Sequence, residues 1–185
     1  MTSAPQARDQ LRDDVNARLA GRPLVLVGMM GAGKSTIGRA LAERMRRTLL
    51  DTDQMVESRA GRSVRRIFAD DGEAVFRAME TAALGEALAA SPPVVVAAAG
   101  GVVLAEANRA ALAASGAKVV WLCASPALLA RRTARGGHRP LLDGDRLGTL
   151  QRMYVEREPL YRAVADVIVS VDHRSVGDVV EALLR

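Results

Sequence analysis

Short apolar runs alternate with amphipathic stretches along most of the chain. The runs are rich in valine and leucine and do not alternate apolar with polar residues, which is typical of strands buried on both faces of a parallel sheet. Five of them predict strands, in the segments PLVLVG, TLLD, PPVVVAAA, AKVVWLCA and ADVIVSV, which span residues 23–28, 48–51, 92–99, 117–124 and 165–171.

Helical patterns fill the intervals between these runs. We expect helices over about 34–46, 104–115, 150–156 and 176–184, a mostly helical stretch over 54–90, and a Gly/Pro/Arg-rich loop over 135–148. Strands that alternate with helices predict a three-layer α/β domain. Residues 1–20 form an N-terminal extension, a loose tail followed by a short amphipathic helix that ends before Gly21, and residues 21–185 form a single domain.

Composition places the chain among globular proteins. Its 185 residues, 49% of them hydrophobic and 25% charged, suffice for one domain with a real core. The N-terminus has no apolar segment typical of a leader, and no apolar stretch approaches 18 residues. We therefore expect a cytoplasmic protein with no membrane contact. The single cysteine, Cys123, excludes an intramolecular disulfide and a multi-cysteine zinc site.

The formal net charge of +5 and the isoelectric point of about 10.3 raise nucleic acid as a partner. The basic residues, however, are scattered over nearly every segment and form no basic platform with aromatic residues for stacking bases. A solvated arginine-rich surface with one anion site fits the pattern better, and we expect no nucleic-acid partner. Lysine occurs only at Lys34 and Lys118, so a lysine inside a glycine loop stands out.

That loop, GMMGAGKS at residues 28–35, matches G-x-x-x-x-G-K-[ST] between a predicted strand and a predicted helix. Its glycines let backbone N–H groups point at phosphate oxygens, and the helix N-terminus adds partial positive charge. Lys34 would reach the β- and γ-phosphates, and Ser35 would offer an oxygen to Mg²⁺. We predict a nucleoside triphosphate site. The short chain and the absence of an N-K-x-D motif favour a small-molecule kinase over a GTPase or a motor.

Two carboxylates end the second predicted strand, in the segment LLDTD. If strand geometry persists, Asp51 and Asp53 leave the same face and Thr52 points away from them. The carboxyl end of a strand is where ligands bind in open α/β sheets. Adjacent carboxylates repel each other, and Mg²⁺ near Asp51 would resolve this conflict and help to keep Asp53 ionised. The competing interpretation is that Asp53 caps the next helix.

The helical stretch also carries candidate chemistry. Arg77 and Glu80 are three residues apart, so they pair on one helix face, either as a surface ion pair or as part of a site. Phe68 and Phe76 are the only phenylalanines, and they serve either as core or as walls for a small ring. The segment ARGGHRPLLDGD, at residues 134–145, combines glycines with arginines as a closing lid would, or it is a surface loop.

Six segments together resemble the shikimate kinase family, within the nucleoside monophosphate kinase structural group. They are the glycine loop, LLDTD, IFADDGEAVFRAME, AAAGG, RRTARGGHRPLL and REPLY. The resemblance implies a P-loop kinase fold, a five-stranded parallel sheet of order 2-3-1-4-5 with helices on both faces, a substrate-binding segment at about 54–82 and a mobile lid at about 135–148. It also implies a monomer that phosphorylates the 3-hydroxyl of shikimate, with ATP as co-substrate and Mg²⁺ as cofactor, in aromatic amino-acid biosynthesis.

The resemblance further implies a role for individual residues. Those for ATP are Gly31, Ala32, Gly33, Lys34, Ser35, Thr36, Arg132, Arg139 and Arg174, of which Arg132 and Arg174 would line the adenine. Those for the acid substrate are Asp53, Arg77, Glu80, Gly100, Gly101, Arg157, Phe68 and Phe76, with both arginines on its carboxylate. Ser35 and Asp51 would hold the metal, and catalysis would rest on Asp53 as the base, Lys34 and Arg139.

One position departs from the family pattern. The family has three consecutive glycines where this chain has Ala99, Gly100 and Gly101, and the methyl group of Ala99 restricts φ and could crowd a substrate. This keeps open a kinase for another small carboxylated or cyclic polyol. A nucleotide-responsive module without turnover is a third interpretation. Arguing against it is the joint presence of Lys34, Ser35, Asp51, Asp53 and Arg139.

Overall fold

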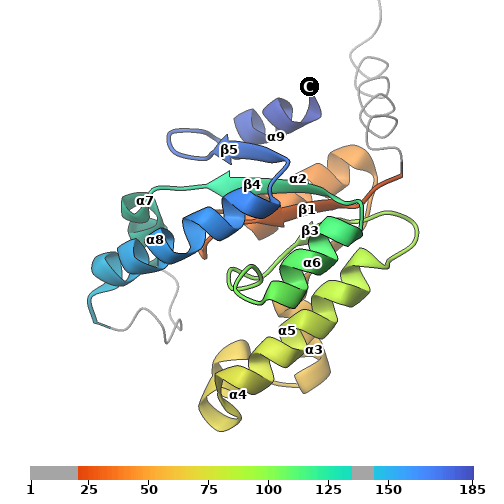
Figure 1. Cartoon of the computed structure of the whole chain (residues 1–185). Coiled ribbons are helices and arrows are strands. Elements are labelled where there is room, and N and C mark those ends of the chain that lie inside the picture. The colour runs from red at the N-terminus through yellow and green to blue at the C-terminus, as the bar shows by residue number, and fades with distance from the viewer. Residues whose placement is uncertain (1–20, 135–143) are drawn as a thin grey trace, which may run out of the picture.

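Five parallel strands form the centre of the fold in a computed structural model, which describes residues 21–134 and 144–185 (Figure 1). The strands are β1 Leu24–Val27, β2 Leu49–Asp51, β3 Val95–Ala97, β4 Lys118–Cys123 and β5 Val167–Ser170. Their order in the sheet is β2-β3-β1-β4-β5, which confirms the predicted order. Each strand lies within the apolar run that predicted it.

β1 is the central strand, with β3 and β2 on one side and β4 and β5 on the other. Leu24 lies opposite Val95 of β3 and opposite Lys118 of β4. All four β1 side chains are buried, so the strand reads as a continuous apolar run without alternation. The absence of apolar–polar alternation in this segment is therefore explained by burial on both faces of the sheet.

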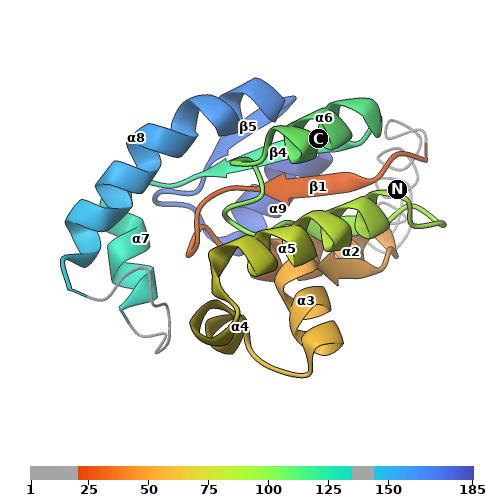
Figure 2. The ribbon, with the colours of Figure 1, turned by 60° about the horizontal axis from the view of Figure 1, so that its bottom comes forward.

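Helices cover both faces of the sheet, as the alternating pattern predicted. They are α2 Lys34–Met45, α3 Thr52–Ala60, α4 Val64–Asp70, α5 Gly72–Leu88, α6 Glu106–Ala114, α7 Pro126–Thr133, α8 Arg146–Val164 and α9 Val176–Leu184. Figures 1 and 2 show α2 and α9 on one face, with α5, α6 and α8 on the other. None of the helices in the described part of the chain has both the length and the apolar character needed to span a bilayer.

Two helical predictions needed correction. No helix was expected at α7, where Ser125 caps the first turn and Pro126 occupies the first helical position. The helix expected over 150–156 begins at Arg146 and continues through Pro159 to Val164. A proline usually ends a helix, but the buried face of α8, formed by Leu150, Met153, Arg157 and Tyr161, packs on the sheet and holds the helix together.

The carboxyl ends of three strands meet at one edge of the sheet. Ala97 at the end of β3 lies opposite Asp51 of β2 and opposite Leu26 of β1. The glycine loop, LLDTD and AAAGG therefore emerge side by side, although their strands end far apart in the sequence, at Val27, Asp51 and Ala97. Ligands bind at such an edge in open α/β sheets, near the point where the strand order reverses.

Helices α3, α4 and α5 carry a small hydrophobic core of their own. Val56, Ile67, Phe76 and Ala83 are buried together, apart from the main core around the sheet. The buried hydroxyl of Thr52 joins this unit to the sheet edge by accepting a hydrogen bond from the backbone N–H of Ala99, at 2.9 Å. The same contact aligns the start of α3 with the loop after β3.

Replacing Thr52 by valine should therefore destabilise the fold. The substitution keeps the shape of the side chain but leaves a buried N–H unpaired, which costs about 1–3 kcal/mol. Chemical denaturation followed by circular dichroism measures the loss in the free energy of unfolding. Thr133→Val is the matched control, because the buried Thr133 hydroxyl donates to the Leu129 and Ala130 carbonyls of its own helix, and its removal should cost under about 1 kcal/mol. Equal losses for the two variants would contradict the prediction.

Candidate active site

A pocket of about 750 Å³ opens at the shared edge of β1, β2 and β3. Most of the candidate residues line it, and they come from all three loops and from α3, α4, α5 and α8. The sequence-predicted residues that line it are Gly31, Gly33, Lys34, Ser35, Thr36, Asp51, Asp53, Phe68, Phe76, Arg77, Glu80, Gly100, Gly101 and Arg157. The structure therefore places the phosphate loop and the acidic and basic side chains of α3, α5 and α8 around one cavity.

The glycine loop adopts the backbone conformations that its composition predicts. Gly28, Gly31 and Gly33 have φ of 143°, 83° and 99°, which side chains other than glycine rarely adopt. A Cβ on Gly28 would also lie 2.6 Å from the backbone oxygen of Leu122. The ammonium of Lys34 folds over the loop and donates to the carbonyls of Gly28 at 2.8 Å and Met29 at 3.1 Å. The loop and its lysine form a compact cationic end of the pocket.

Asp51 links the phosphate loop to α3. Its Oδ2 accepts a hydrogen bond from Ser35 Oγ at 2.6 Å, and its Oδ1 accepts one from the backbone N–H of Asp53 at 3.1 Å. Asp51 is therefore the N-cap of α3, with the extended φ and ψ of −103° and 115° that a cap requires. The argument that strand geometry places Asp51 and Asp53 on one face was wrong, because the strand ends at Asp51 and the helix begins at Thr52. The competing view that Asp53 is the cap was also wrong.

The oxygen pair of Ser35 and Asp51 has the chemistry that a magnesium ion requires. Both are hard oxygen ligands, they lie 2.6 Å apart, and they stand beside the phosphate loop at the N-terminus of α2. In nucleotide sites Mg²⁺ takes one or two protein oxygens and completes its shell with phosphates and water. The residues present therefore fit Mg²⁺ bound with a nucleotide.

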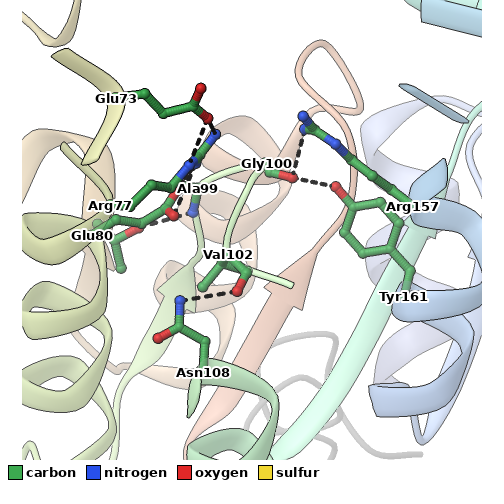
Figure 3. A network of polar contacts seen from close by, with 10 residues as sticks. Glu73, Arg77, Glu80, Ala99, Gly100, Val102, Asn108, Arg157 and Tyr161 are labelled. Atoms are coloured by element: carbon green, nitrogen blue, oxygen red, sulfur yellow. Dashed lines mark hydrogen bonds and ion pairs between the residues drawn. The ribbon is translucent and has the colours of Figure 1, made fainter. Parts of the chain in front are cut away.

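Arg77 lies on α5 and is held by two carboxylates of the same helix (Figure 3). Its Nη1 donates to both oxygens of Glu80 at 3.0 Å, and its Nη2 donates to Glu73 at 2.9 Å. Burial lowers the pKa of Arg77, but the carboxylates of Glu80 and Glu73 outweigh this and raise its pKa above the usual value. Glu80 is only 1% exposed, so this is a buried pair and not the surface ion pair that was the alternative.

Arg157 reaches the pocket from α8, beside a residue that had no predicted role. Its Nη1 lies 3.3 Å from the carbonyl oxygen of Gly100, and the Tyr161 hydroxyl donates to the same oxygen at 2.5 Å. Figure 3 shows both side chains converging on that carbonyl. Burial raises the pKa of Tyr161 above its usual value, so the hydroxyl keeps its proton and acts as a donor. Tyr161 lies four residues after Arg157 on the same face of one helix, and this spacing is the sequence signal that could have found it.

The two phenylalanines belong to the small core and also line the pocket. Their ring centroids are 4.6 Å apart with the planes tilted by 36°, and Phe76 is buried in that core. Both rings also line the pocket, and the guanidinium of Arg77 lies 5.3 Å from the Phe76 ring centroid. They give the cavity an apolar wall next to its charged groups.

Some candidate residues lie elsewhere. Ala32, Arg132 and Arg174 do not line the pocket, although Arg132 Nη1 donates to the carbonyls of Gly31 at 3.3 Å and Ala32 at 3.2 Å. Arg174 is exposed just before α9. Arg139 and all but the last five residues of the expected lid lie outside the described residues, as does the N-terminal extension.

Other pocket residues carried no motif that could have found them. Glu57 and Arg65 both line the cavity, from α3 and α4. Glu57 also accepts a hydrogen bond from the backbone N–H of Val64 at 2.9 Å, which joins α3 to the start of α4. Ala99 lines the cavity too, and its φ is not positive, so its methyl group needs no strained backbone. The backbone concern raised by this departure from the glycine triplet is therefore removed.

The chain is similar to one family of known proteins both in sequence and in structure. A family model described as shikimate kinase matches residues 30–185, a range that contains the whole pocket lining. A shikimate kinase of Chromohalobacter salexigens is 47% identical over 163 residues, which cover 88% of this chain and 89% of that relative. The shikimate kinase of Thermobifida fusca is 45% identical over 168 residues, which cover 90% of this chain and 96% of that relative. A solved structure, shikimate kinase from Acinetobacter baumannii in complex with shikimate, is 34% identical with a TM-score of 0.85, and the match covers 92% of this chain and 94% of that one.

The buried Glu80 predicts a pH dependence of stability. Burial raises its pKa above the ordinary 4.5, against the opposing effect of Arg77. The folded protein therefore keeps a proton on Glu80 up to a higher pH than the unfolded chain does. The stabilisation that this proton provides is fully present below pH 4.5 and is lost as pH rises through the folded-state pKa of Glu80. Relative to Glu80→Gln, which does not titrate, the free energy of unfolding of the unmodified protein should fall with rising pH above 4.5.

Urea denaturation at a series of pH values measures this difference. Glu73→Gln is the control for the loss of an Arg77 contact, because Glu73 binds the same guanidinium from an exposed position. A difference between the unmodified protein and Glu80→Gln that stays constant, or grows, as pH rises would overturn the prediction.

Proposed function

The chain belongs to the shikimate kinase family, an ATP-dependent kinase family, and from this premise we propose that it transfers the γ-phosphoryl group of ATP to the 3-hydroxyl of shikimate. One observation supports this proposal most directly. A single pocket is lined by the phosphate loop, by two arginines and by an aspartate. A nucleotide and a small hydroxy acid could therefore meet within it.

The acid end of the pocket suits a carboxylate. Arginine binds both carboxylate oxygens through its planar fork, and Arg77 and Arg157 approach from opposite walls, on α5 and α8 (Figure 3). Glu80 orients Arg77 by accepting from Nη1 through both its oxygens. The rings of Phe68 and Phe76 offer an apolar surface for the carbon ring of shikimate. These contacts support the assignment of residues 54–82 as the substrate-binding segment.

Asp53 takes the role of the group that orients and deprotonates the attacking hydroxyl. It lies in the first turn of α3, directly after the Asp51 cap, and it lines the pocket. Its charge also raises the pKa of Glu80, which supports a place for Asp53 near the buried Arg77–Glu80 pair. A carboxylate within reach of the substrate hydroxyl can accept its proton as the phosphoryl group transfers.

The nucleotide end neutralises phosphate charge. The N–H groups of the glycine loop and the N-terminus of α2 would hold the β-phosphate, and Lys34 would exchange its loop carbonyls for phosphate oxygens. Ser35 and Asp51 would hold Mg²⁺, which supplies positive charge to the phosphates when bound. Arg132 lies beside the glycine loop, and with Arg139 and Arg174 it completes the proposed set of nucleotide residues.

The same proposal covers the setting of the enzyme. Both substrates are small and polar, which fits a cytoplasmic protein. The family resemblance implies a monomer, and the proposal keeps that assignment. We assign no nucleic-acid or membrane partner.

The proposal predicts shikimate-dependent ADP release and a strong loss of activity in Asp53→Asn. With purified protein, ATP and Mg²⁺, adding shikimate should start ADP formation and yield a phosphorylated acid detectable by mass spectrometry. The amide cannot accept the hydroxyl proton, so Asp53→Asn should lower kcat by about 10² or more and leave the KM for ATP nearly unchanged.

Asp70→Asn is the matched control for this test. Asp70 lies on α4, pairs with the exposed Arg66 and does not line the pocket, so its amide variant should keep the kcat of the unmodified protein. Absence of shikimate-dependent ADP release, with ATP still bound, would refute the proposed function. Full kcat in Asp53→Asn would refute only the role of Asp53.

A further inference from the structure

The loop between β3 and α6 is tied down along its backbone by side chains from other elements. Its Ala99 N–H donates to Thr52 Oγ1, and the carbonyl of Val102 accepts from Asn108 Nδ2 at 3.0 Å (Figure 3). Arg109 Nη1 donates to the next two carbonyls, at 2.8 and 2.9 Å. The loop is therefore held from α3 at one end and from α6 at the other.

Between these ties lies the most adjustable peptide unit of the loop, the one that joins Gly100 to Gly101. A peptide plane can turn through ψ of the residue before it and φ of the residue after it, and glycine places few limits on either angle. A side chain at either position would crowd its neighbours. A Cβ on Gly101 would collide with the guanidinium of Arg77, and a Cβ on Gly100 would lie 3.2 Å from the backbone nitrogen of Met30.

Two donors from α8 restrain this plane through its one carbonyl oxygen. The Tyr161 hydroxyl donates to the Gly100 carbonyl at 2.5 Å, and Arg157 Nη1 approaches it at 3.3 Å. The tyrosine bond is much the shorter, so it is the stronger restraint. It also stays available if Arg157 turns toward a substrate carboxylate, whereas the contact from Arg157 does not.

Fixing the carbonyl of Gly100 also fixes the N–H of Gly101. Both groups belong to one planar trans peptide unit, in which C=O and N–H point in opposite directions. With the oxygen directed at α8, the N–H points away from Tyr161. Within residues 21–134 and 144–185, neither this N–H nor that of Gly100 donates a hydrogen bond to the protein. Both glycines line the pocket, so the N–H of Gly101 is a donor left for a ligand.

The tyrosine side chain is itself immobile. It is 1% exposed, and its ring stacks on Trp121 with centroids 5.7 Å apart and planes inclined by 19°. The ring is ordinary core, and phenylalanine would pack in the same way. Only the hydroxyl reaches the loop, so its function is separable from packing.

We propose that Tyr161 is a positioning residue, whose hydroxyl locks the Gly100–Gly101 peptide plane so that the Gly101 N–H is preorganised to donate to a hydroxyl or carboxylate oxygen of the acid substrate. The inference rests on the proposed function for the identity of that substrate. The lock itself is a property of the free protein. A preorganised donor binds without the cost of first ordering the loop.

Tyr161→Phe tests the effect on substrate binding. The variant should raise the KM for shikimate about fivefold, the size of one lost hydrogen bond, and leave the KM for ATP unchanged. Tyr154→Phe is the matched control, because Tyr154 lies on the same helix, does not line the pocket, and places its hydroxyl 3.5 Å from Cys123 Sγ. This control should leave both KM values unchanged. A merely structural loss would not separate the two substrates in this way.

Amide NMR tests the lock without any substrate. In the 19.6 kDa protein labelled with ¹⁵N, the Gly101 cross-peak should be sharp, should broaden or split in Tyr161→Phe, and should be unchanged in Tyr154→Phe. An unchanged Gly101 signal in Tyr161→Phe overturns the lock, whatever the kinetics show. An unchanged shikimate KM in that variant, or an equal rise in both KM values, overturns the role in substrate binding. Failure of the unmodified protein to phosphorylate shikimate refutes the proposed function, and it is recorded separately from these outcomes.

Discussion

Parallel pairing of β1 with β3 on one side and β4 on the other is the constraint on which the rest of the structure depends. Because all the strands point the same way, the loops that follow them emerge at one edge. The phosphate loop follows β1, the Asp51 cap ends β2, and the Ala99–Gly101 loop follows β3. The pocket is therefore a consequence of strand order, and its chemistry is a consequence of which residues stand in three short loops.

Polar contacts between different elements hold those loops in register with one another. Ser35 with Asp51 joins the phosphate loop to α3, Thr52 joins α3 to the loop after β3, and Tyr161 joins that loop to α8. A buried polar group without a partner is costly, so each contact excludes alternative arrangements of the loops as well as stabilising this one. These contacts connect the nucleotide end of the site to the acid end through three segments distant in sequence.

Sequence patterns predicted the strands and helices more accurately than they predicted the local backbone geometry at the ends of these elements. The five strands and the P-loop conformation followed from apolar runs and glycine spacing, and the strand order followed from the family resemblance. The shared face of Asp51 and Asp53 did not hold, because a cap at Asp51 converts strand to helix within one residue. Helix α8 extends beyond Pro159, because packing of its buried face outweighs the local preference of proline. The first failure came from a local cap, and the second came from tertiary packing that outweighs a local preference.

The sequence by itself determined the kind of chemistry, since a glycine loop with Lys34 and Ser35 between a strand and a helix has few other uses. It also determined which side chains were available, such as the arginines of FRAME and REPLY. Only the tertiary structure decided which of them meet. Packing buries Glu80 beside Arg77 on α5, and it brings Arg157 and Tyr161 of α8 to the Gly100 carbonyl, 57 and 61 residues earlier in the chain. Such contacts depend on how α5 and α8 pack against the sheet, and no pattern within a single segment contains that information.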